Sequence, residues 1–144
     1  MSLFTTIALI SFVGAPVPKT DPLKQAQQDF QGEWKVVEFI RGGRADGAEE
    51  LERENVVVKG DLFTFTHTKV EMVTFILDPK ASPARIDFTK IGPPKQGAEM
   101  LGIYKLEGNK LTIIASFDGD ERPKNFKSAD GPRICTFVLE RVKK

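Results

Sequence analysis

The chain has 144 residues, 40% of them hydrophobic, which is enough for one compact domain with a single core and too little for two ordinary ones. Its 21 Lys and Arg residues and 20 Asp and Glu residues give a formal net charge of +1, so no overall field attracts nucleic acid or an anionic membrane. The single cysteine, Cys135, excludes an intramolecular disulfide, and its apolar, strand-like surroundings favour a small buried hydrophobe over a reactive thiol.

The N-terminal residues 3–13 are apolar and uncharged, and this segment is too short to cross a bilayer as a helix. It is typical of the hydrophobic region of a signal peptide, and Val13-Gly14-Ala15 supplies the small or modest residues that precede a cleavage site. We therefore expect cleavage after Ala15, export to the periplasm or the extracellular space, and no stable membrane span afterwards. Because no Lys or Arg precedes Lys19, an uncleaved anchor or a cytosolic hydrophobic arm is the alternative.

A short helix is expected next. Asp21 is a favourable N-cap residue, Pro22 suits the first helical position, and good helix formers follow as far as Phe30. Leu23, Ala26 and Phe30 recur at near-helical spacing. Such a stripe can seal one end of a barrel, although an ordered lead-in without a functional role is the simpler interpretation.

From residue 33 onward the hydrophobicity alternates with a period of two, which predicts strands with one face on a core. Gly60-Asp61 and Gly108-Asn109 predict tight hairpins, so neighbouring strands are expected to be antiparallel. The fold class is therefore all-β, an up-and-down, lipocalin-like barrel of about eight strands that closes on itself and so hides its edges. The strands are expected near residues 33–41, 55–59, 62–67, 70–78, 84–91, 98–106, 110–117 and 133–142. The expected organisation is a signal peptide at 1–15, a linker and short helix at 16–29, and a barrel domain at 30–144.

The same alternation predicts which side chains face the interior. Phe75, Phe88, Tyr104 and Phe117 fall on inward rows, and we take them as candidates for contact with a ligand. An eight-stranded barrel has room for packed side chains or for one small molecule, so both outcomes stay open at this point.

Glu38 is the one polar candidate for such a site. Strict alternation from Trp34 and Val36 carries it inward, where a carboxylate needs a partner or a raised pKa. A β-bulge after Val37 would instead return Glu38 to solvent, and this alternative also stays open.

One motif marks the start of the first strand. Gly32-Glu33-Trp34 resembles the Gly-x-Trp motif of lipocalins and their calycin relatives, in which the Trp closes one barrel end beneath an Arg from the last strand. Arg141 shares the parity of the inward row of the last strand, so it is expected to stack on Trp34. The resemblance implies a structural role in barrel closure for Gly32, Trp34 and Arg141, and it moves any ligand site toward the opposite end.

A closer resemblance covers residues 27–143. It rests on segments that include the Glu121-Arg122-Pro123 triplet and the stretches 30–37, 75–79, 84–89, 101–108 and 139–143. These segments resemble the lipocalin-like domain family of unknown function that is expanded in planctomycete bacteria. The resemblance implies an exported small barrel with no established activity, catalytic residue or cofactor.

No residue set in the sequence predicts catalysis. His67, the only histidine, has no second His or Cys near it in the sequence, so neither a metal site nor an activated nucleophile is expected. The cluster at 118–121 gathers carboxylates without the spacing of a calcium loop and is interpreted as a polar turn, with cation binding as the alternative. Arg41-Gly42-Gly43-Arg44 predicts a turn and not an RNA contact. We thus expect no catalytic residue, no metal and no cofactor.

Two functions remain after these exclusions. The first is a non-enzymatic barrel that binds a small apolar or amphipathic molecule in its interior. The second is a fully packed barrel that meets another protein through its outer face or loops.

Overall fold

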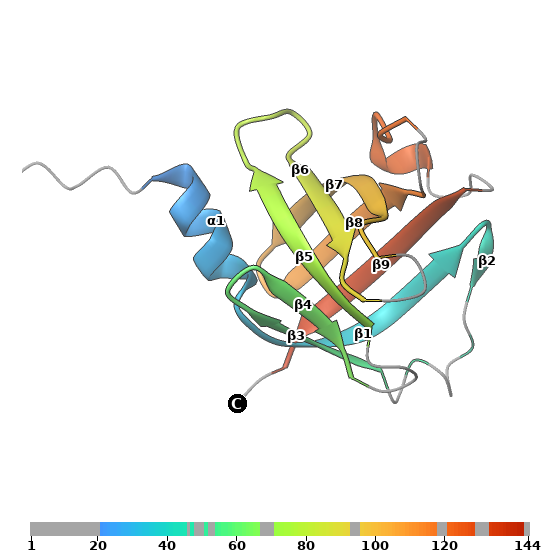
Figure 1. The fold of residues 1–144 in the computed structure, drawn as a ribbon, viewed down its shortest axis with the longest axis horizontal. Coiled ribbons are helices and arrows are strands. Elements are labelled where there is room, and N and C mark those ends of the chain that lie inside the picture. Colours follow the sequence, from blue (N-terminus) through green and yellow to red (C-terminus); the bar gives the residue numbers. More distant parts are fainter. Residues whose placement is uncertain are drawn as a thin grey trace, which may run out of the picture.

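A computed structural model of the protein describes residues 21–45, 47, 51, 54–66, 71–92, 96–117, 121–128 and 133–142. In this part of the chain, helix α1 (Pro22–Phe30) precedes a run of strands that wraps into a barrel (Figure 1). The expected signal peptide at 1–15, His67 and residues 118–120 of the acidic cluster lie outside the described residues.

The sheet is entirely antiparallel, with the strand order β2-β1-β3-β4-β5-β6-β7-β8-β9, and a further pairing between β1 and β9 closes the barrel. The strands are β1 (Gly32–Arg41), β2 (Arg44–Ala45), β3 (Asn55–Lys59), β4 (Leu62–Phe65), β5 (Glu71–Asp78), β6 (Arg85–Lys90), β7 (Glu99–Glu107), β8 (Lys110–Ser116) and β9 (Ile134–Arg141). The two residues of β2 only extend a hairpin from β1, so the wall has eight strands. The predicted all-β, up-and-down barrel with one short helix is confirmed.

Glycine turns connect the neighbouring strands where the sequence predicted them. Gly60 and Gly108 have φ values of +63° and +59°, which residues with a side chain rarely adopt, and they lie between β3 and β4 and between β7 and β8. Gly42 and Gly43 also have positive φ and form the turn from β1 into β2, as predicted for that segment.

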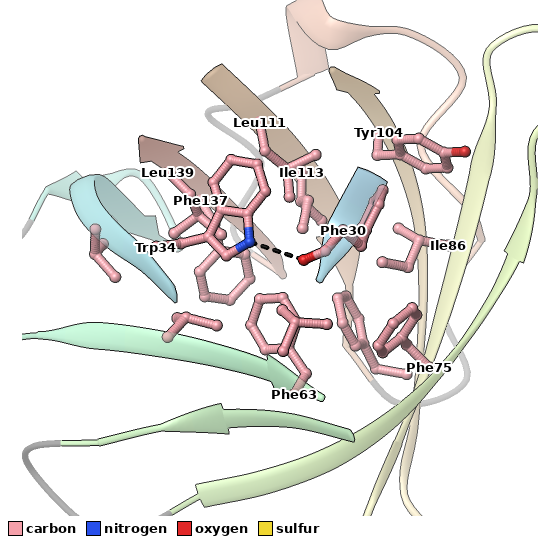
Figure 2. Packing of buried hydrophobic residues seen from close by; sticks show 14 of the residues in the cluster. Phe30, Trp34, Phe63, Phe75, Ile86, Tyr104, Leu111, Ile113, Phe137 and Leu139 are labelled. Atoms are coloured by element: carbon pink, nitrogen blue, oxygen red, sulfur yellow. Dashed lines mark hydrogen bonds between the residues drawn. The ribbon is translucent and has the colours of Figure 1, made fainter. Parts of the chain in front are cut away.

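The interior of the barrel is built from aromatic rings in direct contact. Phe63 is central, with ring centroids 5.5 Å from Phe88 and 6.3 Å from Phe75, and Phe30 of α1 stacks on Phe75 at 5.6 Å (Figure 2). These rings meet edge to face or offset, arrangements that add to the gain from burial. Most residues of the inward rows predicted from alternation are buried here, with Leu111 and Ile113 on β8 fully inaccessible, whereas Phe117 is partly buried.

Helix α1 begins and ends at well-defined partners. The Asp21 carboxylate accepts a hydrogen bond from the Leu23 amide at 3.0 Å, and Pro22 occupies the first turn. At the other end, the Gln31 side chain donates to the Gly60 carbonyl and accepts from the Gly60 amide, at 2.9 and 2.7 Å. These bonds fasten the helix to the β3–β4 hairpin and place Phe30 at the barrel end, so the helix seals that end.

A β-bulge in β1 overturns the inward placement of Glu38. Val36 pairs with Leu139, but the next partner on β9, Val138, pairs with Glu38, so Val37 is an extra residue. The bulge shifts the parity of the strand, and Phe39 packs inside against Phe137, with ring centroids 4.8 Å apart. Glu38 is exposed on the outer surface. The prediction of an inward carboxylate was wrong, and the bulge alternative is correct.

A second apolar layer lies on the outer face of β7, β8 and β9. Ile103, Ile114 and Val138 point away from the interior, yet each is at most 7% exposed. The segment 121–128, which includes the 3-10 turn η1 (Phe126–Ser128), lies against this face. Its Arg122 donates to the Asp87 carboxylate and, at 2.8 Å, to the Gly102 carbonyl.

No helix in the described part of the chain is both long enough and apolar enough to cross a bilayer.

Candidate functional site

The barrel end next to α1, which we call the sealed end, is closed by Trp34 and Arg141. Trp34 is fully buried, and its indole N–H donates to the Phe30 carbonyl at 2.9 Å (Figure 2). The Arg141 guanidinium lies 4.2 Å from the centre of the Trp34 ring, the contact that the resemblance of the Gly-x-Trp motif implies and that strand parity allows.

The same guanidinium also caps α1. It donates to the backbone carbonyl of Gln31 at 2.8 Å and to that of Asp29. Because the last carbonyls of a helix lack partners within it, a cation at this position satisfies them and opposes the negative end of the helix dipole. Gly32 has a φ of +116°, which a residue with a side chain would adopt only under strain. These contacts join helix, first strand and last strand into one closed structure.

The four aromatic ligand candidates do not surround an empty space. Phe75, Phe88 and Tyr104 are between 4% and 7% exposed, and all three belong to the packed core. Phe63 brings Phe75 and Phe88 together, while Phe30 contacts Tyr104 edge to face at 5.0 Å. The middle of the barrel is therefore filled by side chains. Phe117 lies apart from them, just beyond the end of β8.

The opposite end of the barrel, which we call the distal end, is where β1 and β8 finish and β9 begins. Its side chains continue the core but remain partly exposed. They are Phe39, Leu51, Phe65, Val73, Met100 and Phe117. Of these, sequence analysis proposed only Phe117 as a site residue. Phe39 was missed because the bulge reverses its parity, so strict alternation puts it on the outer face. For Phe65 in β4 and Met100 in β7, alternation alone predicts an inward side chain.

A hollow of about 280 Å³ lies on the outer face, between η1 and strands β1, β7, β8 and β9. Glu38 stands at its rim, so the structure places this residue at an outside surface, away from Phe75 and the other candidates. Lys105 lies 3.5 Å from the Glu107 carboxylate and over the Phe126 ring at 4.9 Å. On the floor, the Thr136 hydroxyl is buried and has no hydrogen-bond partner among the described residues.

A second hollow, of about 300 Å³, lies between α1 and the barrel, and Tyr104 is one of its lining residues. Burial raises the pKa of the Tyr104 phenol, and the nearby carboxylates of Asp29 and Asp78 raise it further. Both hollows lie outside the ring of buried aromatic residues.

The described ranges contain no group of three or more His, Cys, Asp or Glu side chains placed to hold a metal ion. Cys135 is buried in β9, in the environment that its sequence context predicts.

Comparison with protein-family models, with curated proteins and with solved structures finds no significant match to this chain. Function must therefore be inferred from the geometry of the closed barrel.

Proposed function

We propose that the protein is an exported, lipocalin-like, non-enzymatic binding barrel, and that a small apolar or amphipathic molecule binds at its distal end. Within the proposed family, Gly32, Trp34 and Arg141 correspond to the Gly-x-Trp motif and its arginine. The proposal of export depends on the apolar segment at 3–13 and the small residues that follow it.

The observation that carries the proposal is the difference between the two barrel ends. A helix, a buried tryptophan and a capping arginine close the sealed end. At the distal end, large apolar side chains such as Phe39, Phe65 and Phe117 continue the core while staying partly exposed. Partly exposed aromatic side chains at the mouth of a barrel suit contact with an apolar ligand. The filled interior restricts such a ligand to this end.

Dye binding tests the proposal. The probe is 1-anilinonaphthalene-8-sulfonate, whose fluorescence reports apolar contact, with dodecanoate as a competing amphipathic ligand. We expect saturable binding that dodecanoate displaces, and Phe117→Ser should weaken it about tenfold, since partial burial of one aromatic side chain is worth roughly 1.4 kcal/mol. The matched control is Ile76→Ser, because Ile76 is 72% exposed on the outer surface of β5. Equal loss in both variants, or no saturable binding by the wild type, would count against the proposal.

A packed interaction module is the second candidate function, and a specific observation favours it. The rings of Phe30, Phe63, Phe75 and Phe88 fill the barrel, and the two hollows described above lie outside them. Native mass spectrometry of protein purified from its own host separates the two functions. A bound small molecule supports the ligand barrel, whereas a partner protein with no added small mass supports the interaction module.

A further inference from the structure

The hollow between α1 and the barrel is large enough to hold a small molecule. It holds about 300 Å³, at the lower end of the range for small-molecule pockets, which starts at roughly 300 Å³. Its walls are mainly apolar and come from three elements that are separate in the sequence: Ala26 of α1, Pro79 after β5, and Leu106 of β7.

The polar groups in this hollow are acidic or neutral. They are the Asp29 carboxylate, the Gln25 amide and the Tyr104 phenol, and none of the described residues that line the hollow is basic. Gln25 donates to Asp29 Oδ1 at 2.8 Å, which orients the carboxylate, and no described residue donates to its second oxygen. Among charges, the Asp29 and Asp78 carboxylates act most strongly on the Tyr104 phenol, and both raise its pKa. The one charged group among the described lining residues is therefore acidic, and so are the two charges that act on Tyr104.

Arg141 lies beside this hollow but makes no ion pair with the Asp29 carboxylate. Its guanidinium bonds the backbone carbonyl of Asp29, not the carboxylate, and it stacks on Trp34. It is not among the lining residues. The Tyr104 hydroxyl, in contrast, points away from the labelled core side chains (Figure 2).

We propose that this hollow is a second binding site, separate from the distal end, and that it takes a small free organic cation, an ammonium with apolar substituents. The positive charge would face Asp29 and the Tyr104 ring, and the apolar substituents would pack on Ala26, Pro79 and Leu106. An aromatic ring beside a carboxylate within apolar walls is the chemistry that recognises quaternary ammonium groups. A bare metal ion does not fit, because the walls offer it too few oxygen ligands.

A pair of isosteres tests the charge requirement. Choline and 3,3-dimethyl-1-butanol have the same shape, but only choline is charged. Each is titrated into the ¹⁵N-labelled protein at constant ionic strength, and amide shifts are followed. We expect saturable shifts in α1 and around Tyr104 and Leu106 with choline, and binding of the neutral isostere about tenfold weaker. Equal affinity of the two compounds, or choline shifts confined to the distal end, would overturn the proposal.

Charge variants test the residue assignment. Asp29→Asn should weaken choline binding at least about fivefold and leave the neutral isostere unchanged. Asp61→Asn is the matched control, since it removes the same charge from an exposed carboxylate in the β3–β4 turn. It should change neither the affinity for choline nor the affinity for the neutral isostere. An unaltered choline affinity in Asp29→Asn would show that the carboxylate is not part of a site.

The tyrosine gives an independent readout. Tyr104 is the only tyrosine, so absorbance at the phenolate band reports its titration alone. Bound choline should lower the pKa of this phenol, because a cation favours the phenolate. Failure of choline to move the pKa at saturating concentration contradicts the proposal, and so does binding to phosphatidylcholine vesicles without binding of free choline. The distal-end proposal, which uses a different probe and different variants, is unaffected by these outcomes.

Discussion

Replacing Arg141 should destabilise the whole barrel, because one side chain joins three elements. Its guanidinium donates to the carbonyls of Asp29 and Gln31 and stacks on Trp34 at 4.2 Å. We expect Arg141→Met to keep the packing of the aliphatic stem and to lose the polar contacts.

The magnitude follows from these contacts. Each hydrogen bond from the partly exposed guanidinium is worth about 1 kcal/mol and the cation–π contact about 1 kcal/mol more, so Arg141→Met should lower the free energy of unfolding by about 3 kcal/mol. Arg141→Lys retains the charge and a stacking contact but cannot donate to both carbonyls in the same way, so it should lose about half as much.

Urea denaturation measures both losses. Trp34 is the only tryptophan and lies directly under Arg141, so its fluorescence reports the sealed end, and circular dichroism reports the sheet. Arg85→Met on β6 is the control, because Arg85 is exposed, and it should stay within about 0.5 kcal/mol of the wild type. Two results would contradict this reasoning: Arg141→Lys as stable as the wild type, or Arg85→Met losing as much stability as Arg141→Met. Either would show that the hydrogen bonds of Arg141 to α1 do not stabilise the fold.

Two further predictions concern single residues of the core. The pKa of Tyr104 is raised above its ordinary value of about 10 in the native state, so at higher pH the unfolded state loses this proton while the native state keeps it. The free energy of unfolding should therefore fall as the pH rises past about 10. Below that pH it should not depend on this group. Urea denaturation from pH 9 to 11.5 should therefore show a steeper decline for the wild type than for Tyr104→Phe, and equal slopes would contradict the prediction. Gly102→Ala should cost about 1–3 kcal/mol, because the added Cβ would lie 2.8 Å from the Ile114 carbonyl oxygen and 3.1 Å from that of Ile86. Gly47→Ala, where nothing lies within 4 Å, is the matched control in thermal unfolding, and a similar loss in both variants would show that crowding at Gly102 is not the cause.

The strand pattern was predictable because its signals are local. In β8, Leu111 lies between Lys110 and Thr112, and Ile113 continues the same inward row two residues on. The glycine turns at 60 and 108 each separate two antiparallel strands. These features depend on adjacent residues alone, so a period of two is enough to place the strands and their inward rows.

The bulge in β1 was not predictable in the same way. Whether Val37 is an extra residue depends on how β1 aligns with Leu139 and Val138, which lie about a hundred positions away in the sequence. Strict alternation therefore placed Glu38 inside, and it missed Phe39. The two hollows were unpredictable for the same reason, because each depends on contacts between segments distant in the sequence. One forms where α1 lies against the barrel wall, and the other where the segment 121–128 does.

The sequence by itself determined the fold class, the hairpins and the inward rows outside β1, because each follows from local periodicity. The contact of Trp34 with Arg141 was expected from the resemblance of the Gly-x-Trp motif, and strand parity allows it. Only the tertiary structure decided that the aromatic rings fill the interior, that Glu38 faces solvent, and that Arg141 caps the helix. These properties depend on the register between distant strands and on how α1 docks, and no local pattern specifies either of them.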